Sequence, residues 1–102
     1  MLKVLVVDDF PLFRRGVRDL VTEGFPGAII GEAGDAHEML EVLRREPWGM
    51  AVMDISMPGM KGLDAIKQVK QEFPDLPVLI LSMYPEEQYA IRMLKAGADG
   101  YL

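Results

Sequence analysis

The stretch VLVVDDFP, residues 4–11, sets the pattern for the whole chain, because an apolar run ends there in two acidic residues and a proline. Its four aliphatic side chains are consecutive rather than alternating, which is typical of a strand buried on both faces and therefore of a parallel sheet. Further apolar runs follow at residues 28–30, 50–53 and 78–81, and a last short segment, GYL, occupies residues 100–102. The sequence thus predicts five strands.

Stretches with helical periodicity separate these runs, each with one apolar stripe and charged or amide residues opposite it. The stripes consist of Phe13, Val17, Leu20 and Val21; Ala36, Met39, Leu40 and Leu43; Leu63, Ile66, Val69 and Phe73; and Ala90, Met93, Leu94 and Gly97. Pro11 suits the first turn of the first helix, and Asp35 with Glu38 forms a variant of the capping box that opens the second. Strands and helices therefore alternate, and right-handed crossovers turn that order into an open, doubly wound α/β sheet with helices on both faces.

The composition limits the chemistry that this chain can perform. Its 102 residues suffice for one domain. The absence of cysteine excludes disulfides, thiol catalysis and cysteine-ligated zinc, and the single histidine excludes a metal site with several histidines. A net charge of −5 disfavours direct binding to nucleic acid. No apolar run approaches the roughly 18 residues of a membrane span, and no signal peptide is visible, so we expect a cytoplasmic protein without a membrane partner.

Polar side chains stand at the carboxyl ends of three predicted strands, which is the edge where open α/β sheets bind their ligands. Asp8 and Asp9 come after the first strand, Asp54 ends the third and Ser82 follows the fourth. We expect the three carboxylates to cluster there, open to solvent, and to need a cation that relieves their repulsion. A cluster of oxygen ligands suits Mg²⁺, and a third carboxylate beside the metal can attack a phosphorus atom. Taken singly, Asp9 also suits a helix N-cap and Ser82 a turn.

Other sites that bind or transfer phosphate fit the sequence less well. The loop at residues 8–11 is acidic and poor in donors, whereas a flavin phosphate site needs hydroxyls and amides there. The chain has neither a Gly-x-Gly-x-x-Gly nor a Gly-Lys-Ser/Thr motif for nucleotides. A phosphatase with an Asp-x-Asp motif is the weaker alternative, because the second residue after Asp54 is Ser56.

Four segments, in this order and spacing, resemble the receiver domain of two-component response regulators: VLVVDDFP (4–11), MDISMPGMKG (53–62), LILS (79–82) and KAGADGYL (95–102). Two stretches, DDFPLFRRG (8–16) and GEA (31–33), are most similar to the transcription regulators whose receiver precedes a helix-turn-helix domain, the NarL/FixJ/LuxR type. The resemblance implies a flavodoxin-like fold with the parallel strand order 2-1-3-4-5. It also implies one receiver domain over residues 1–102, which ends at the fifth strand and lacks the last helix.

The resemblance implies a role for each polar residue at the predicted edge. Asp54 would accept a phosphoryl group from a sensor histidine kinase, and Ser82 would be the switch hydroxyl that moves to a phosphoryl oxygen. Asp8, Asp9 and Asp54 would hold Mg²⁺ together with the backbone carbonyl of Ser56. The domain would catalyse only its own phosphorylation and dephosphorylation, and would not be an enzyme for other substrates.

The resemblance also implies how the signal leaves the site. Tyr101 would be the aromatic switch partner that changes between exposed and buried and informs a DNA-binding output domain. Without the last helix the sheet exposes apolar surface, so we expect homodimers. Arg14, Arg15 and Arg18 suit either contact with an acidic kinase surface or a solvated helix face. A protein-interaction domain that works without phosphorylation is the alternative function.

Overall fold

The computed structural model describes residues 2–54, 62–81, 95, 97 and 99–101, and for residues 54, 62, 63 and 101 it describes the backbone only. Its elements, in chain order, are β1 (Lys3–Val7), α1 (Pro11–Gly24), β2 (Ile29–Ala33), α2 (Ala36–Arg45), β3 (Met50–Asp54), α3 (Gly62–Glu72), β4 (Val78–Leu81) and β5 (Gly100–Tyr101). Most of the helix predicted between β4 and β5 lies outside the described residues, although Lys95 is described and is helical.

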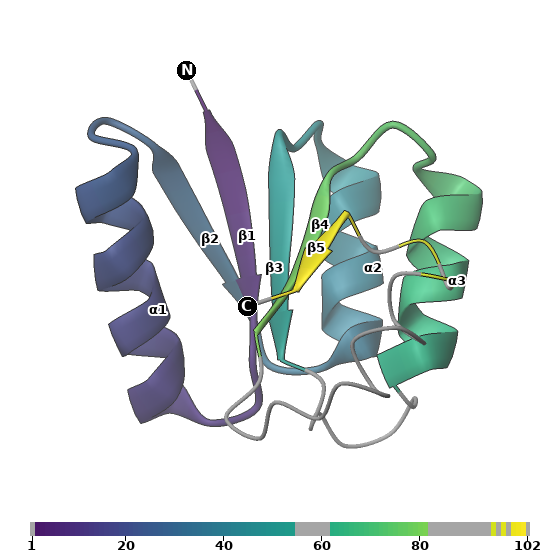
Figure 1. The fold of residues 1–102 in the computed structure, drawn as a ribbon, viewed down its shortest axis with the longest axis horizontal. Helices are drawn as coiled ribbons and strands as arrows, with labels where there is room; N and C mark the ends of the chain where they lie inside the picture. Colours follow the sequence, from purple (N-terminus) through teal and green to yellow (C-terminus); the bar gives the residue numbers. More distant parts are fainter. Residues whose placement is uncertain (1, 55–61, 82–94, 96, 98, 102) are drawn as a thin grey trace.

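The strands form one parallel sheet in the order β2-β1-β3-β4-β5 (Figure 1). This is the strand order and the flavodoxin-like fold that the resemblance to receiver domains implied. Strand β2 departs from its predicted extent, because it begins at Ile29 and continues through Gly31 and Glu32 to Ala33. Its sequence is less apolar because β2 is an edge strand, paired only with β1, and most of its residues are half-buried or exposed.

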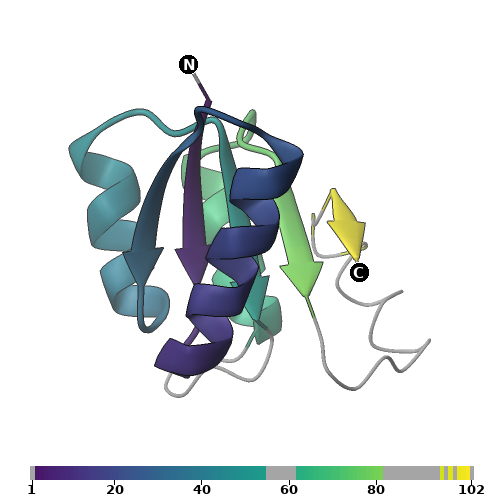
Figure 2. The ribbon, with the colours of Figure 1, turned by 90° about the vertical axis from the view of Figure 1, so that its left-hand side faces the viewer.

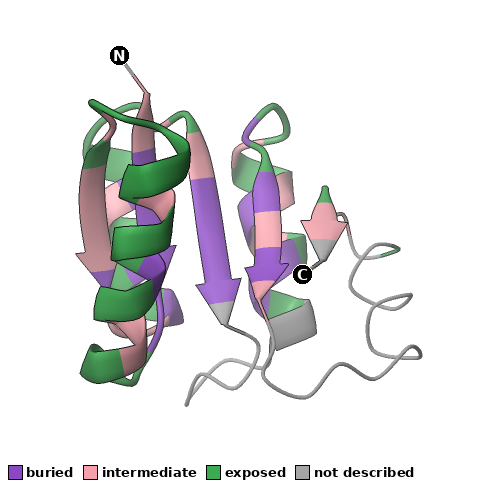
Figure 3. Ribbon diagram, turned by 60° about the vertical axis from the view of Figure 1, so that its left-hand side comes forward, coloured by how far each residue is buried: buried purple, intermediate pink, exposed green. Residues whose placement is uncertain are grey.

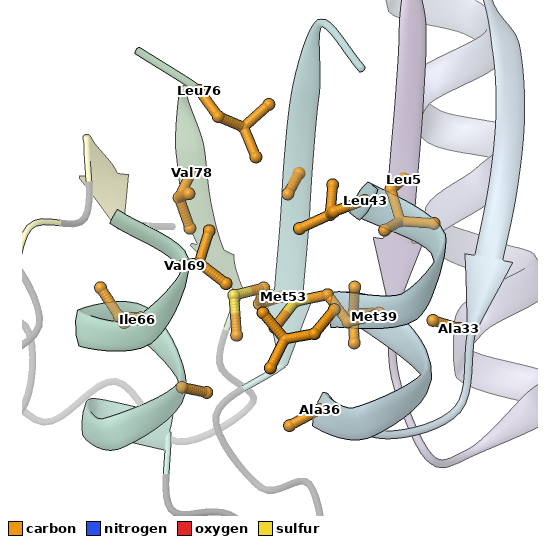
Figure 4. Close-up of a cluster of buried hydrophobic side chains, with 14 of the residues drawn as sticks. Leu5, Ala33, Ala36, Met39, Leu43, Met53, Ile66, Val69, Leu76 and Val78 are labelled. Carbon is orange, nitrogen blue, oxygen red and sulfur yellow. The ribbon is translucent and has the colours of Figure 1, made fainter. Parts of the chain in front are cut away.

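Helix α1 covers one face of the sheet, and α2 and α3 cover the other (Figures 1 and 2). Strand β1 contributes to both layers. Val4 and Val6 pack in a cluster with Val17 of α1, whereas Leu5 and Val7 belong to the larger cluster beneath α2 and α3 (Figure 4). These four side chains are at most 1% exposed, and Figure 3 shows burial running along both β1 and β3. The prediction of strands buried on both faces is confirmed for β1 and β3, but it is wrong for β2, most of which is half-buried or exposed.

The first helical turns match the sequence signals only in part. Helix α2 begins as predicted, because the Asp35 carboxylate accepts a hydrogen bond of 2.8 Å from the Glu38 backbone N–H. In a capping box the Glu38 carboxylate would accept a hydrogen bond from the Asp35 N–H. Here Glu38 Oε2 accepts instead from the N–H of the preceding residue, Gly34, at 3.3 Å. Helix α1 has Phe10 at its N-cap position, without a side-chain cap. The alternative interpretation of Asp9 as an N-cap is therefore wrong.

Trp48, between α2 and β3, packs against β2 at Gly31. A Cβ atom added to Gly31 would lie 2.4 Å from Trp48 Cη2, so a glycine is required for this close approach. Trp48 Nε1 donates a hydrogen bond of 3.2 Å to the Val42 carbonyl, and Lys3 Nζ lies 4.8 Å from the centroid of the indole ring. The ring is thus held by a strand, a helix and a cation.

Candidate functional site

The backbones of Asp8 and Asp54 lie at the same edge of the sheet. Strands β1 and β3 are parallel neighbours, and Val7 is in register with Met53, so Asp8 and Asp54 are the next residue along each strand direction. Asp54 is also in register with Leu81, the last residue of β4. The carboxyl ends of three neighbouring strands therefore meet at one level, with the two acidic residues on adjacent strands.

The other predicted site residues are only partly described. Tyr101 lies in β5, where its backbone is in register with Ile80 of β4. Ser56 and Ser82 lie outside the described residues, as do the side chains of Asp54 and Tyr101. The structure thus places the strand that carries Tyr101 beside the strand that leads to Ser82.

The two acidic residues after β1 have different surroundings. Asp8 is buried, with 1% of its surface exposed, whereas Asp9 is exposed. The expectation of a solvent-open carboxylate is therefore wrong for Asp8. Its backbone N–H donates a hydrogen bond of 3.0 Å to the Ala33 carbonyl of β2, and its Oδ1 accepts one of 2.9 Å from the Phe10 N–H. Asp8 continues the strand by one residue, and its carboxylate bonds back to the loop instead of extending into solvent.

Arg14, in the first turn of α1, links this loop to β2. Its Nη1 donates a hydrogen bond of 2.8 Å to the Asp8 carbonyl, and its Nε donates one of 2.8 Å to Glu32 Oε1. Arg18, one turn later, donates from Nη1 to Glu32 Oε2 at 3.2 Å. The structure gives both arginines a role that the sequence analysis missed. The available signal was Glu32, an acidic residue between the apolar residues that follow Ala28.

The described part of the site supplies two of the three predicted carboxylates. Within it, no three acidic or histidine side chains gather closely enough to hold a metal ion. The Asp54 side chain does not belong to that described set, so the proposed trio of Asp8, Asp9 and Asp54 stays a prediction. The described oxygen donors are one buried and one exposed carboxylate, on consecutive residues of one loop.

Comparison with protein families matches residues 4–102 to the response regulator receiver domain. The chain belongs to the response regulator receiver domain family. The resemblance drawn from the sequence motifs is therefore confirmed, and the sheet order of the receiver domain agrees with it.

Relatives of this receiver domain include transcription regulators. Transcriptional activator protein ExaE of Pseudomonas putida is 36% identical over 97% of this chain and 46% of its own length. A two-component response regulator of the LuxR family from Aurantimonas sp. SI85-9A1 superposes with a TM-score of 0.89 at 34% identity, over 97% of this chain and 71% of that one. Response regulator TrrA of Thermotoga maritima, solved in complex with Mg²⁺ and BeF, superposes with a TM-score of 0.87 at 27% identity, over 100% of this chain and 85% of that one. The chain spans about half the length of the curated relatives it matches.

Proposed function

We propose that this receiver domain is the phosphoacceptor module of a two-component transcription regulator, in which Asp54 receives a phosphoryl group from a sensor histidine kinase. The observation that carries the proposal is the register of the sheet, which pairs Val7 with Met53 and so brings the backbones of Asp8 and Asp54 to one edge. Membership of the receiver family and the transcription regulators among its relatives support the same role.

The residues at this edge fit Mg²⁺. Asp8 and Asp9 would offer carboxylate oxygens at the end of one strand and Asp54 at the end of its neighbour, and the resemblance adds the backbone carbonyl of Ser56. Magnesium prefers such oxygen donors and takes few protein carboxylates. The related TrrA was solved in complex with Mg²⁺ and BeF. When bound, Mg²⁺ neutralises charge on the phosphoryl oxygens.

The Asp54 carboxylate acts as the nucleophile. One of its oxygens forms a bond to phosphorus while the phosphorus–nitrogen bond of the kinase phosphohistidine breaks, and the departing imidazole nitrogen is protonated by solvent. Water later hydrolyses the acyl phosphate and returns the free carboxylate. The domain therefore catalyses only its own phosphorylation and dephosphorylation, and is not an enzyme for other substrates.

Ser82 and Tyr101 carry the signal out of the site. The Ser82 hydroxyl hydrogen-bonds a phosphoryl oxygen, and Tyr101 changes between exposed and buried. The register of Tyr101 with Ile80 supports this relay, since Ser82 follows Ile80 by two residues on the same stretch of chain. The signal then reaches a DNA-binding output domain. The receiver domain itself, with its net charge of −5, does not bind nucleic acid directly.

The proposed receiver domain occupies residues 1–102 and works in the cytoplasm, where the kinase partner presents its phosphohistidine. No helix in the part of the chain that the structure describes is long and apolar enough to cross a membrane.

Labelling with acetyl phosphate tests the proposal. In the presence of Mg²⁺ the chain should gain one phosphoryl group by intact mass, and Asp54→Asn should abolish that gain while the circular dichroism spectrum is retained. Asp64→Asn is the matched control, because Asp64 is an exposed carboxylate on α3, and it should be labelled like the wild type. Labelling of Asp54→Asn would place the acceptor elsewhere. A wild-type chain that takes up no phosphoryl group would favour a protein-interaction domain that works without phosphorylation.

A further inference from the structure

The loop between β1 and α1 carries both described acidic residues of the candidate site, and it is fixed through Asp8. The Asp8 N–H bonds to Ala33 at 3.0 Å, and the Asp8 Oδ1 accepts from the Phe10 N–H at 2.9 Å. A third bond reaches the Asp8 carbonyl from Arg14 Nη1, at 2.8 Å. The first two bonds belong to the strand and the loop, whereas the third comes from a side chain of the following helix.

The Arg14 guanidinium is held on its other side by β2. Its Nε bonds to Glu32 Oε1 at 2.8 Å, while Glu32 Oε2 accepts from Arg18 at 3.2 Å. The Arg14 and Glu32 side chains are 22% and 33% exposed, so the pair is partly shielded from water. Because the donors of a guanidinium point in fixed directions, Arg14 cannot make both bonds without setting the position of the Asp8 carbonyl relative to Glu32.

The same guanidinium also lies beside the loop after β2. A Cβ atom added to Gly34 would lie 3.5 Å from Arg14 Nη1 and 3.6 Å from Glu38 Oε2. The Gly34 N–H in turn bonds to that Glu38 oxygen at 3.3 Å. Arg14 therefore stands between the two strand-to-helix loops that follow β1 and β2 at the carboxyl edge of the sheet.

We propose that Arg14 is a positioning residue for the candidate site. Through the Asp8 carbonyl it fixes the direction in which Asp8 and Asp9 present their carboxylates, and Glu32 holds it in place. This inference rests on the proposed function, because its consequence is measured as binding of Mg²⁺ by those carboxylates. A purely electrostatic effect of the Arg14 charge would oppose binding of a cation, so its removal alone would strengthen Mg²⁺ binding, whereas loss of positioning weakens it.

Calorimetric titration with Mg²⁺ tests this role, at a temperature where every variant is folded. Arg14→Ala should weaken Mg²⁺ binding by about tenfold or more, as loss of a group that orients a metal ligand does. Arg14→Lys keeps the positive charge but loses the planar guanidinium, so this variant should also bind Mg²⁺ more weakly than the wild type. Glu32→Gln should shift the affinity in the same direction. Arg15→Ala is the matched control, since it removes the same charge at the next, exposed position of α1, and it should bind Mg²⁺ like the wild type.

Amide hydrogen exchange of the metal-free protein gives an independent readout. The Phe10 N–H, which bonds to Asp8 Oδ1, should exchange faster in Arg14→Ala, while the amides of β1 stay protected. A change confined to this loop separates a positioning role from a general loss of stability, which would speed exchange throughout the sheet.

Wild-type Mg²⁺ affinity in Arg14→Ala would overturn the positioning role, and so would wild-type affinity in Arg14→Lys, because the two bonds of the planar guanidinium would then not be needed. If the wild type neither binds Mg²⁺ nor is labelled on Asp54, the proposed function fails instead. In that case faster Phe10 exchange in Arg14→Ala would still support the fixing of the loop by Arg14, and unchanged exchange would overturn it.

Discussion

At the scale of single residues, one carboxylate joins three elements at the amino edge of the sheet. Asp99 Oδ2 accepts hydrogen bonds from the Val78 N–H at 2.8 Å and from Lys70 Nζ at 3.0 Å, and Lys70 also donates to the Leu76 carbonyl at 2.8 Å. Partial burial disfavours the charged form of Asp99, but the bond from Val78 and the bond and charge of Lys70 outweigh it, so the pKa of Asp99 is lowered. The start of β5 is thereby attached to β4 and α3.

Asp99→Asn should destabilise the fold in a pH-dependent manner. The pKa of Asp99 is lower in the folded than in the unfolded chain, so its contribution is complete above the usual aspartate pKa of about 3.9 and disappears as pH falls through the folded value. In urea unfolding, the free-energy difference between wild type and variant should be larger at pH 7 than at pH 3. Asp75→Asn, at an exposed position before β4, is the control. An equal difference at both pH values would contradict the role of the Asp99 charge.

The sequence predicted the place of the acidic residues better than their surroundings. Asp8 and Asp54 could be assigned to one edge because parallel strands end together, whatever their side chains do. The burial of Asp8 and its bond to Arg14 could not be predicted, because they depend on how α1 and β2 pack together in the folded protein. Glu32 lies 18 residues from its partner Arg14, beyond the reach of any local pattern.

At the scale of elements, β2 is fitted closely to the segment between α2 and β3. Gly31→Ala should cost roughly 1–3 kcal/mol, as overpacking does, because the added Cβ would lie 2.4 Å from a ring atom of Trp48. Gly16→Ala, on α1, meets nothing within 4 Å and should be neutral or stabilise by roughly 0.5–1 kcal/mol. Thermal unfolding would measure both changes.

A double-mutant cycle identifies the cause of the Gly31→Ala effect. If Trp48 is the obstacle, Gly31→Ala should cost little in a Trp48→Ala background, although Trp48→Ala is itself destabilising. An equal cost in both backgrounds would show that the backbone of β2, and not the indole ring, requires the glycine.

Elements with strong end signals were predicted closely, and those without them were not. Helix α1 begins at Pro11, the residue that marks its first turn in the sequence. Strand β2 was underestimated because Gly31 and Glu32 interrupt its apolar run, and both have reasons that lie elsewhere in the fold. Gly31 makes room for Trp48, and Glu32 binds the arginines of α1.

At the scale of the whole molecule, the three helices that the structure describes cover the two faces of the sheet unequally. Helix α1 lies over one side of its face, and β4 stands clear of it in Figure 2. A groove of about 190 Å³ runs beside the helix, with an apolar lining made of Val17, Leu20, Val21, Phe25, Met50, Val52, Leu79 and Leu81. Leu20 is 66% exposed and Phe25 is 47% exposed.

We expect the 102-residue chain to self-associate through this groove, since burying one leucine contributes roughly 1.5–3 kcal/mol. Sedimentation velocity should show a concentration-dependent dimer, and Leu20→Lys should shift it to the monomer. Leu12→Lys is the matched control, because Leu12 is 70% exposed on the same helix but does not line the groove. A chain that stays monomeric at all concentrations, or an equal effect of Leu12→Lys, would contradict association through the groove.

The packing of Trp48 gives this protein a built-in optical reporter. It is the only tryptophan of the chain and precedes β3 at the amino edge of the sheet, where Met50 is in register with Val4. Asp8 lies at the opposite, carboxyl edge. The intrinsic fluorescence of Trp48 therefore reports unfolding of the core. Mg²⁺ bound at the carboxyl edge does not contact the indole ring and so does not quench it directly. A shift in emission during a Mg²⁺ titration would mean that the strands had transmitted a structural change along their whole length.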